Sequence, residues 1–184
     1  MQILLKKIKL RVLTECYANK CLAEELKKFL VDIANISSIR HSPKMGREKL
    51  LKIASRISEN IEENELLLII IDYERGLARK YIDTNFKIYS SLYNDAVHIA
   101  ASVGFKKFKV IAIIFDPDIE EFLCRTMDKY CKNLERKMLK HGNQDRICRG
   151  LQSVMDIGLS SIIKDLAGAL KKLLSEMPKQ SITT

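Results

Sequence analysis

The sequence has few of the residues that interrupt regular secondary structure. Its 184 residues include seven glycines, three prolines and no tryptophan, whereas 47% of the residues are hydrophobic. A chain with this much apolar surface and so little glycine and proline forms a packed core, which excludes collagen-like, low-complexity and disordered classes. The length suits one domain, or one domain with a helical extension.

Long hydrophobic runs are also absent. No apolar run is longer than six residues, and the one at residues 66–71 ends at Asp72. A transmembrane helix needs about 20 apolar residues. Lys6, Lys7 and Lys9 interrupt the N-terminal apolar stretch where a secretory signal would need its hydrophobic region. The sequence therefore predicts a cytoplasmic protein with no membrane partner.

Cysteine pairs at metal-binding spacing are missing. The five cysteines form an odd set without a C-x-x-C pair, and they are Cys16, Cys21, Cys124, Cys131 and Cys148. This pattern argues against a disulfide framework and against a structural zinc site. We expect mostly buried thiols, which is the usual state of free cysteine.

The chain does contain an alternation of apolar patterns that is typical of α/β proteins. Alternating or continuous apolar residues predict strands at 8–14, 36–39, 66–71 and 108–115. Helical spacing of apolar residues predicts helices at 19–32, 50–57, 77–103, 119–138 and 151–170, the third of them capped by Gly104. This order predicts a Rossmann-like, mainly parallel sheet of about four strands with flanking helices and a C-terminal helical pair.

The chain is expected to have two regions. Residues 1–142 would form the α/β part, and residues 143–184 would form a helical extension packed on the same domain. The apolar stripe of residues 151–170 is typical of a helix packed on the body of the protein. The same stripe could form a homodimer interface, and both uses stay open.

Acidic residues follow three of the predicted strands. They are Glu15, then Asp72 and Glu74, then Asp116, Asp118 and Glu120. The carboxyl ends of parallel strands meet at one edge of the sheet, where ligands bind. Carboxylates that converge repel one another unless a cation neutralises them, and Mg²⁺ or Mn²⁺ prefers oxygen ligands. The sequence predicts such a cation at this edge, although Asp118 could instead serve only as a helix N-cap.

Over residues 8–123 this arrangement resembles the TOPRIM domains of topoisomerases, primases and OLD-type nucleases, together with their small single-domain relatives. In that family a glutamate follows the first strand, as Glu15 does here, and an Asp-x-Asp follows a later strand, which Asp72-Tyr73-Glu74 approximates. The resemblance implies Mg²⁺-dependent breakage or joining of phosphodiester bonds, with Glu15, Asp72 and Glu74 as catalytic residues and metal ligands. Asp116, Asp118 and Glu120 would support the metal.

The chain departs from the family pattern at two positions. Cys16 stands where the family usually has glycine, and Glu74 replaces the second aspartate. The sequence Asp116-Pro117-Asp118 is a literal Asp-x-Asp and offers an alternative register. Only the assignment to Asp72 leaves room for the intervening strand at 36–39.

The chain is basic. Lysine and arginine total 32 against 23 acidic residues, which gives a formal net charge of +9. Basic side chains bind nucleic-acid phosphates through a salt-dependent contact that is independent of base sequence. The residues that we expect to make such contacts are Arg40, Lys44, Arg47, Arg75 and Arg79. Any one of them could instead simply solvate a helix face.

Two hypotheses of different classes follow. The first is an enzyme, a Mg²⁺- or Mn²⁺-dependent nuclease or phosphoryl-transfer enzyme that acts on nucleic acid. The second is a non-catalytic module that keeps a TOPRIM-like scaffold and uses its positive charge to bind nucleic acid or an acidic protein. A phosphatase that uses the same acids on a small molecule is a third option. Metal binding separates the first hypothesis from the second.

Overall fold

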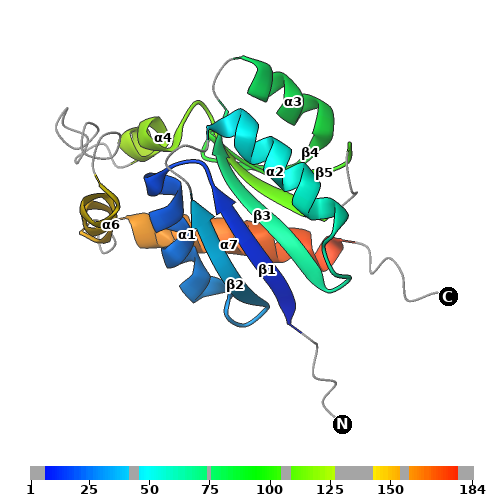
Figure 1. Cartoon of the computed structure of the whole chain (residues 1–184). Helices are drawn as coiled ribbons and strands as arrows, with labels where there is room; N and C mark the ends of the chain where they lie inside the picture. Colours follow the sequence, from blue (N-terminus) through cyan, green and yellow to red (C-terminus); the bar gives the residue numbers. More distant parts are fainter. Residues whose placement is uncertain are drawn as a thin grey trace, which may run out of the picture.

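The computed structural model describes residues 7–41, 46–73, 76–104, 109–126, 143–153 and 158–177. Within these residues the chain forms an α/β structure with six strands and six helices (Figure 1). The strands are β1 (Ile8–Thr14), β2 (Ala34–His41), β3 (Glu65–Asp72), β4 (Phe86–Leu92), β5 (Val97–Ser102) and β6 (Val110–Phe115). The helices are α1 (Tyr17–Leu30), α2 (Arg47–Glu59), α3 (Leu77–Asn85), α4 (Ile119–Thr126), α6 (Gln144–Gln152) and α7 (Leu159–Glu176).

The strands form one mixed sheet in the order β2-β1-β3-β6-β5-β4. The first four strands of this order are parallel, whereas β5 runs antiparallel to both β6 and β4. The predicted α/β class is confirmed, whereas the sheet is larger than the predicted four strands and is partly antiparallel, because β5 runs opposite to its two neighbours. Thr14 lies opposite Ile70 and Asp72 opposite Phe115, so β1, β3 and β6 end at the same edge.

Two apolar layers cover the two faces of the sheet. One layer consists of α1, α4, α6 and α7 packed against Leu68, Ile70 and Ile113 of the central strands. The other consists of α2 and α3 packed against Leu67 and Ile69 (Figure 1). Among the described residues no helix is long and apolar enough to span a membrane.

The predicted helix at 77–103 is wrong in its last two thirds. The structure has helix α3 over the first nine residues, followed by the hairpin of β4 and β5. Tyr93, Asn94 and Asp95 make the turn with positive φ values of 55°, 53° and 64°. Asparagine and aspartate tolerate this conformation better than most residues, and the β-branched and aromatic residues on either side favour strands.

Gly104 does not cap a helix, because it follows strand β5. Its backbone nitrogen donates to the carbonyl oxygen of Asn85 at 3.2 Å, where α3 meets β4. A Cβ atom at position 104 would lie 2.9 Å from the Cα of Asn85. Glycine is therefore required here by the close approach of two backbone segments.

The C-terminal helices pack on the first helix and on the sheet. Apolar residues of α7, including Leu159, Ile163 and Leu166, are fully buried in the layer that contains α1. The predicted helix at 151–170 is thus two helices, α6 and α7, and the predicted helix at 119–138 is described only to Thr126. The proposed division between residues 142 and 143 stays a prediction.

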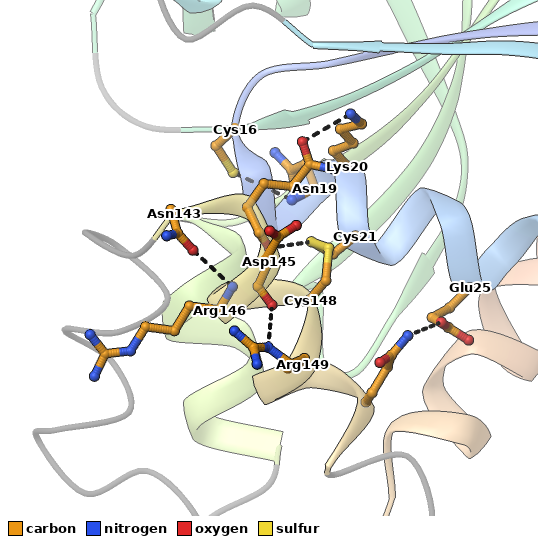
Figure 2. Close-up of a disulfide and its surroundings, with 12 residues drawn as sticks. Cys16, Asn19, Lys20, Cys21, Glu25, Asn143, Asp145, Arg146, Cys148 and Arg149 are labelled. Carbon is orange, nitrogen blue, oxygen red and sulfur yellow. Dashed lines mark hydrogen bonds between the residues drawn. A yellow bond between two sulfur atoms is a disulfide. The ribbon is translucent and has the colours of Figure 1, made fainter.

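A disulfide joins α1 to α6, which corrects the expectation of unpaired thiols. Cys21 and Cys148 are bonded across 127 residues, with their Cα atoms 5.1 Å apart (Figure 2). Cys124 is disulfide-bonded as well, and Cys16 is a free thiol. Spacing along the chain does not reveal such a pair, because only the packing of α6 against α1 brings the two sulfurs together.

Polar contacts accompany the disulfide between the two helices. The Lys20 Nζ donates to Gln144 Oε1 at 3.1 Å, and Gln152 Nε2 donates to Glu25 Oε1 at 3.4 Å. Asn143 caps α6 by accepting a hydrogen bond from the Arg146 backbone nitrogen (Figure 2). The helix α6 is therefore attached to α1 along its whole length.

Removal of the disulfide should destabilise the protein. We expect Cys148→Ser to lower the free energy of unfolding by about 2–4 kcal/mol, because the bond restricts the unfolded chain over a long loop. Urea unfolding measures the difference. In a reducing buffer the two proteins should unfold alike, and a difference that persists there would show that Cys148 acts through packing alone.

Candidate functional site

Four carboxylates gather at the carboxyl edge of the parallel strands. Glu15 follows β1, Asp72 ends β3, and Asp118 and Glu120 lie at the start of α4, directly after β6. We call this group the acidic edge. Asp72, Glu120 and Asp118 are 6%, 8% and 9% exposed. The topology thus brings together acids that are far apart in the sequence, as the sequence analysis predicted.

Hydrogen bonds to backbone nitrogens fix three of these carboxylates. Glu15 Oε2 accepts from the Asp72 nitrogen at 3.0 Å, and Asp72 Oδ1 accepts from the Ile119 nitrogen at 3.1 Å. Asp118 Oδ1 accepts from the Glu121 nitrogen at 2.6 Å, which is the N-cap contact of α4. These contacts connect the end of β1 to β3 and the end of β3 to α4, so the carboxylates also have a structural role.

The pKa of Asp72 is raised well above its usual value. Burial is the largest cause, and the neighbouring charges of Glu15 and Glu120 and, less strongly, of Asp118 act in the same direction. The hydrogen bond from the Ile119 nitrogen opposes this shift without overcoming it. Asp72 therefore has a strong tendency to hold a proton or to accept a cation.

A buried glutamate at the other end of β3 has the opposite environment. The Glu65 side chain is fully buried, and burial alone would raise its pKa. Arg11 donates from Nε at 2.6 Å and from Nη2 at 2.8 Å to its two oxygens, and Lys9 lies 3.3 Å away. These cations outweigh burial and lower the pKa of Glu65. Nearby cations compensate the buried charge of Glu65, whereas the charge of Asp72 is compensated incompletely.

A basic residue from α2 reaches the acidic edge. Arg47, the first residue of α2, donates from Nε to Glu15 Oε1 at 3.0 Å. Both side chains are mostly buried, with exposures of 17% and 13%. The Arg47 guanidinium therefore compensates the charge of Glu15, and its predicted contact with nucleic acid stays a prediction.

Cys16 is a protonated thiol at this site. Burial raises its pKa most, and the charges of Asp72, Glu120 and Glu15 raise it further. Its Sγ accepts a weak hydrogen bond from the Asn19 nitrogen at 3.4 Å and so caps α1. A thiol held neutral in this way is a poor nucleophile, so Cys16 is unsuited to covalent catalysis.

The other predicted site residues are scattered. Asp116 is half-buried, and its backbone nitrogen donates to the Ala96 carbonyl at 2.9 Å. Arg40 is exposed on the edge strand β2, and the Arg79 guanidinium stacks on the Tyr73 ring at 4.2 Å. The remaining predicted residues lie outside the described part of the chain, and they are Lys44, Glu74 and Arg75.

The donor chemistry of the acidic edge suits a hard divalent cation, because all four groups offer carboxylate oxygens. As the described side chains stand, no three histidine, cysteine or acidic groups are close enough together to hold a metal ion. Glu15 and Asp72 are the best placed of them, since a hydrogen bond joins the Glu15 side chain to the Asp72 backbone. A complete site would need a further ligand.

Polar residues that the sequence analysis did not assign to the site lie beside the acidic edge. His98 is buried on β5, where its Nδ1 lies 2.9 Å from Ser91 Oγ and its ring meets the Tyr73 ring edge-on. Tyr73 donates a hydrogen bond to Asp83. Burial, followed by this contact, raises the pKa of the tyrosine. The misassignment of β5 as a helix concealed this group, because it placed His98 away from the sheet edge.

Asn19 is a second missed residue. It is fully buried in the first turn of α1, four residues after Glu15. Within the described part of the chain, its side-chain nitrogen and oxygen have no hydrogen-bond partner. A buried amide normally has a hydrogen-bond partner, so the partner of Asn19 is a water, an ion, a ligand or a residue outside the described part of the chain.

Comparisons of the chain with protein-family models, with curated proteins and with solved structures give no significant match.

The two buried carboxylates of β3 should respond oppositely to neutralisation. We expect Asp72→Asn to raise the thermal stability at neutral pH, because it removes a charge that the folded state disfavours. Glu65→Gln should lower the stability by about 1–3 kcal/mol, because it weakens charged hydrogen bonds. Thermal unfolding of both variants, measured across pH, gives the comparison.

The pH dependence has a definite sign for each group. The advantage of Asp72→Asn should shrink as the pH falls through the raised pKa of Asp72 toward about 3.9, the ordinary aspartate value. The deficit of Glu65→Gln should shrink only below about 4.3, as the wild-type glutamate becomes protonated. A destabilised Asp72→Asn protein at neutral pH would contradict the proposed electrostatic strain at the acidic edge.

Proposed function

We propose that this protein is a Mg²⁺- or Mn²⁺-dependent enzyme that cleaves phosphodiester bonds in nucleic acid. The parallel part of the sheet would be Rossmann-like, with the ligand at its carboxyl edge. The observation that carries the proposal is the uncompensated Asp72, a buried carboxylate surrounded by Glu15, Glu120 and Asp118. The resemblance to TOPRIM domains is part of this proposal.

In this proposal Glu15, Asp72 and Glu74 hold the cation, with support from Asp116, Asp118 and Glu120. When bound, such a cation supplies charge stabilisation to the phosphoryl oxygens of the substrate. Asp72 loses its proton as the cation binds, because metal ligands must be deprotonated. The Glu15 carboxylate would then contact both the Arg47 guanidinium and the cation.

Other residues would bind the nucleic-acid strand, and the nearby cysteine would not compete with hydrolysis. The basic residues that would contact phosphates include Arg40 and Arg79, together with Lys44 and Arg75, which lie outside the described part of the chain. The neutral thiol of Cys16 does not attack phosphorus, so hydrolysis by water fits better than a covalent thiol intermediate. The net charge of +9 favours a polyanionic substrate.

The alternative is a non-catalytic basic module that binds nucleic acid or an acidic protein. The observation that favours it is that the acids already have protein partners: Arg47 pairs with Glu15, and Asp118 caps α4. In this alternative the acidic edge ties strands and helices together, and the basic surface performs the binding. A homodimer through the C-terminal helices would belong to the same alternative.

Thermal unfolding in a Mn²⁺ or Mg²⁺ titration separates the two proposals. A cation that binds only the folded state stabilises it by about 2.7 kcal/mol at 100 times its dissociation constant. We expect this stabilisation in the wild type, and we expect it to grow with pH because the cation displaces the proton of Asp72. Asp72→Ala should abolish it.

The matched control is Asp32→Ala, which removes a carboxylate at the far end of α1, where Asp32 pairs with Lys171 at 2.7 Å. This variant should keep the full response to the cation. Cleavage of labelled single-stranded and double-stranded DNA and RNA then tests the activity, which Asp72→Ala should lose. An unchanged unfolding temperature of the wild type in both cations would overturn the enzyme proposal and leave the binding module.

A further inference from the structure

A cavity of about 610 Å³ lies between the first turns of α2 and α3, and the proposed function does not use it. Its volume is within the range of about 300–1,000 Å³ that small-molecule sites occupy. Both helices lie on the same face of the sheet, opposite α7 (Figure 1). The cavity has room for more than a single inorganic anion.

Among the described residues, two lysines and an arginine line the cavity together with one acid, and the arginine is already paired with Glu15. Lys49 and Lys52 stand three residues apart on α2, and Arg47 lies at its start, whereas Glu48 is the acidic residue of the lining. Both lysines are exposed, and residues three apart on a helix project from the same side. The cavity therefore attracts anions.

The backbone at the cavity adds to this charge. Gly46 and Gly76 are the N-caps of α2 and α3, and neither helix has a side-chain cap on its first turn. A Cβ atom at Gly46 would meet no other atom within 4 Å, so packing does not require glycine there. The uncapped first turns of two helices, whose amino ends have a partial positive charge, thus lie at the same cavity as the two lysines.

The cavity is physically connected to the acidic edge. Arg47 lines it and also donates to Glu15 Oε1 at 3.0 Å. On the side of α3, Leu77 is 74% exposed and presents apolar surface next to the cations. An anion joined to a flat apolar group matches this combination, and a nucleotide unit of a nucleic-acid strand is such a group.

We propose that this cavity binds one phosphate of a nucleic-acid strand through Lys49 and Lys52, with the sugar or base of the same nucleotide against Leu77. The inference deepens the proposed function, and it rests on that function for the position of the cleaved bond at the acidic edge. Binding in the cavity itself needs no divalent cation. Arg47 would set the spacing between the bound phosphate and Glu15.

Binding of a short fluorescein-labelled single-stranded DNA, measured by fluorescence anisotropy in EDTA over a range of salt concentrations, tests the proposal. The test variant is Lys49→Glu/Lys52→Glu. The matched control is Lys164→Glu/Lys172→Glu, which makes the same change in charge at exposed positions of α7 on the opposite face. Thermal unfolding confirms that each variant folds, and Lys49→Gln/Lys52→Gln replaces the test variant if charge reversal prevents folding.

We expect the test variant to bind the DNA roughly tenfold or more weakly across sequences, as for lost phosphate contacts. The slope of log affinity against log salt should fall by about 0.7, because one phosphate contact to a single strand is lost. The control should keep the wild-type slope. Equal losses in both variants, or wild-type binding by the test variant, would overturn the proposal.

Two further arms identify what occupies the cavity. Leu77→Ala should weaken DNA binding and leave competition by inorganic phosphate unchanged, whereas equal effects on both ligands would overturn the contact with a sugar or base. Because the assay contains EDTA, it is independent of the cation. If Mn²⁺ fails to stabilise the wild type but the test variant still binds DNA more weakly than the control, the enzyme proposal is refuted and the phosphate cavity is kept. If Mn²⁺ stabilises the wild type but the test and control variants bind DNA equally, the cavity alone is refuted.

Discussion

The burial of β3 and β6 on both faces is the constraint on which the rest of the structure depends. Every residue of these two strands is buried, so helices must cover both sides of the sheet. Neighbouring strands on each side satisfy their backbone groups. Polar chemistry is thereby confined to the points where the strands leave the core, and the acidic edge lies at one of them. Because helices must cover both faces, α7 belongs to the same core as β1 although it lies far from β1 in the sequence.

The two ends of β3 show how one strand can contain both a structural and a functional carboxylate. Glu65 has a bidentate arginine and a lysine, so its charge stabilises the start of the strand. Among the described residues, Asp72 has acids as neighbours and one backbone donor, so its charge is a cost to the folded state. Proteins retain such costs where activity or binding requires them, and perturbed carboxylates cluster at functional sites for this reason.

The sequence predicted the parts of the fold that have one-dimensional signals. The continuous run of β3, the alternation of β1 and the stripe of α1 all appear where expected, and parallel pairing then brought Glu15, Asp72 and Asp118 to one edge. The β4–β5 hairpin was missed because its turn, centred on Asn94, interrupts apolar residues that also fit a helical period. The pairing of Arg47 with Glu15 and the bond between Cys21 and Cys148 could not be predicted, since both depend on contacts between helices and strands distant in sequence.

The bond between α1 and α6 also has a consequence for the order of events during synthesis. Cys21 and Cys148 are separated by 127 residues, and five of the six described strands lie between them. At about 5–20 residues per second, Cys148 leaves the ribosome roughly 6–25 s after Cys21. Throughout that interval the thiol of Cys21 lacks its native partner, and by its end all six described strands have been made. The bond can therefore form only after the whole described sheet has been synthesised.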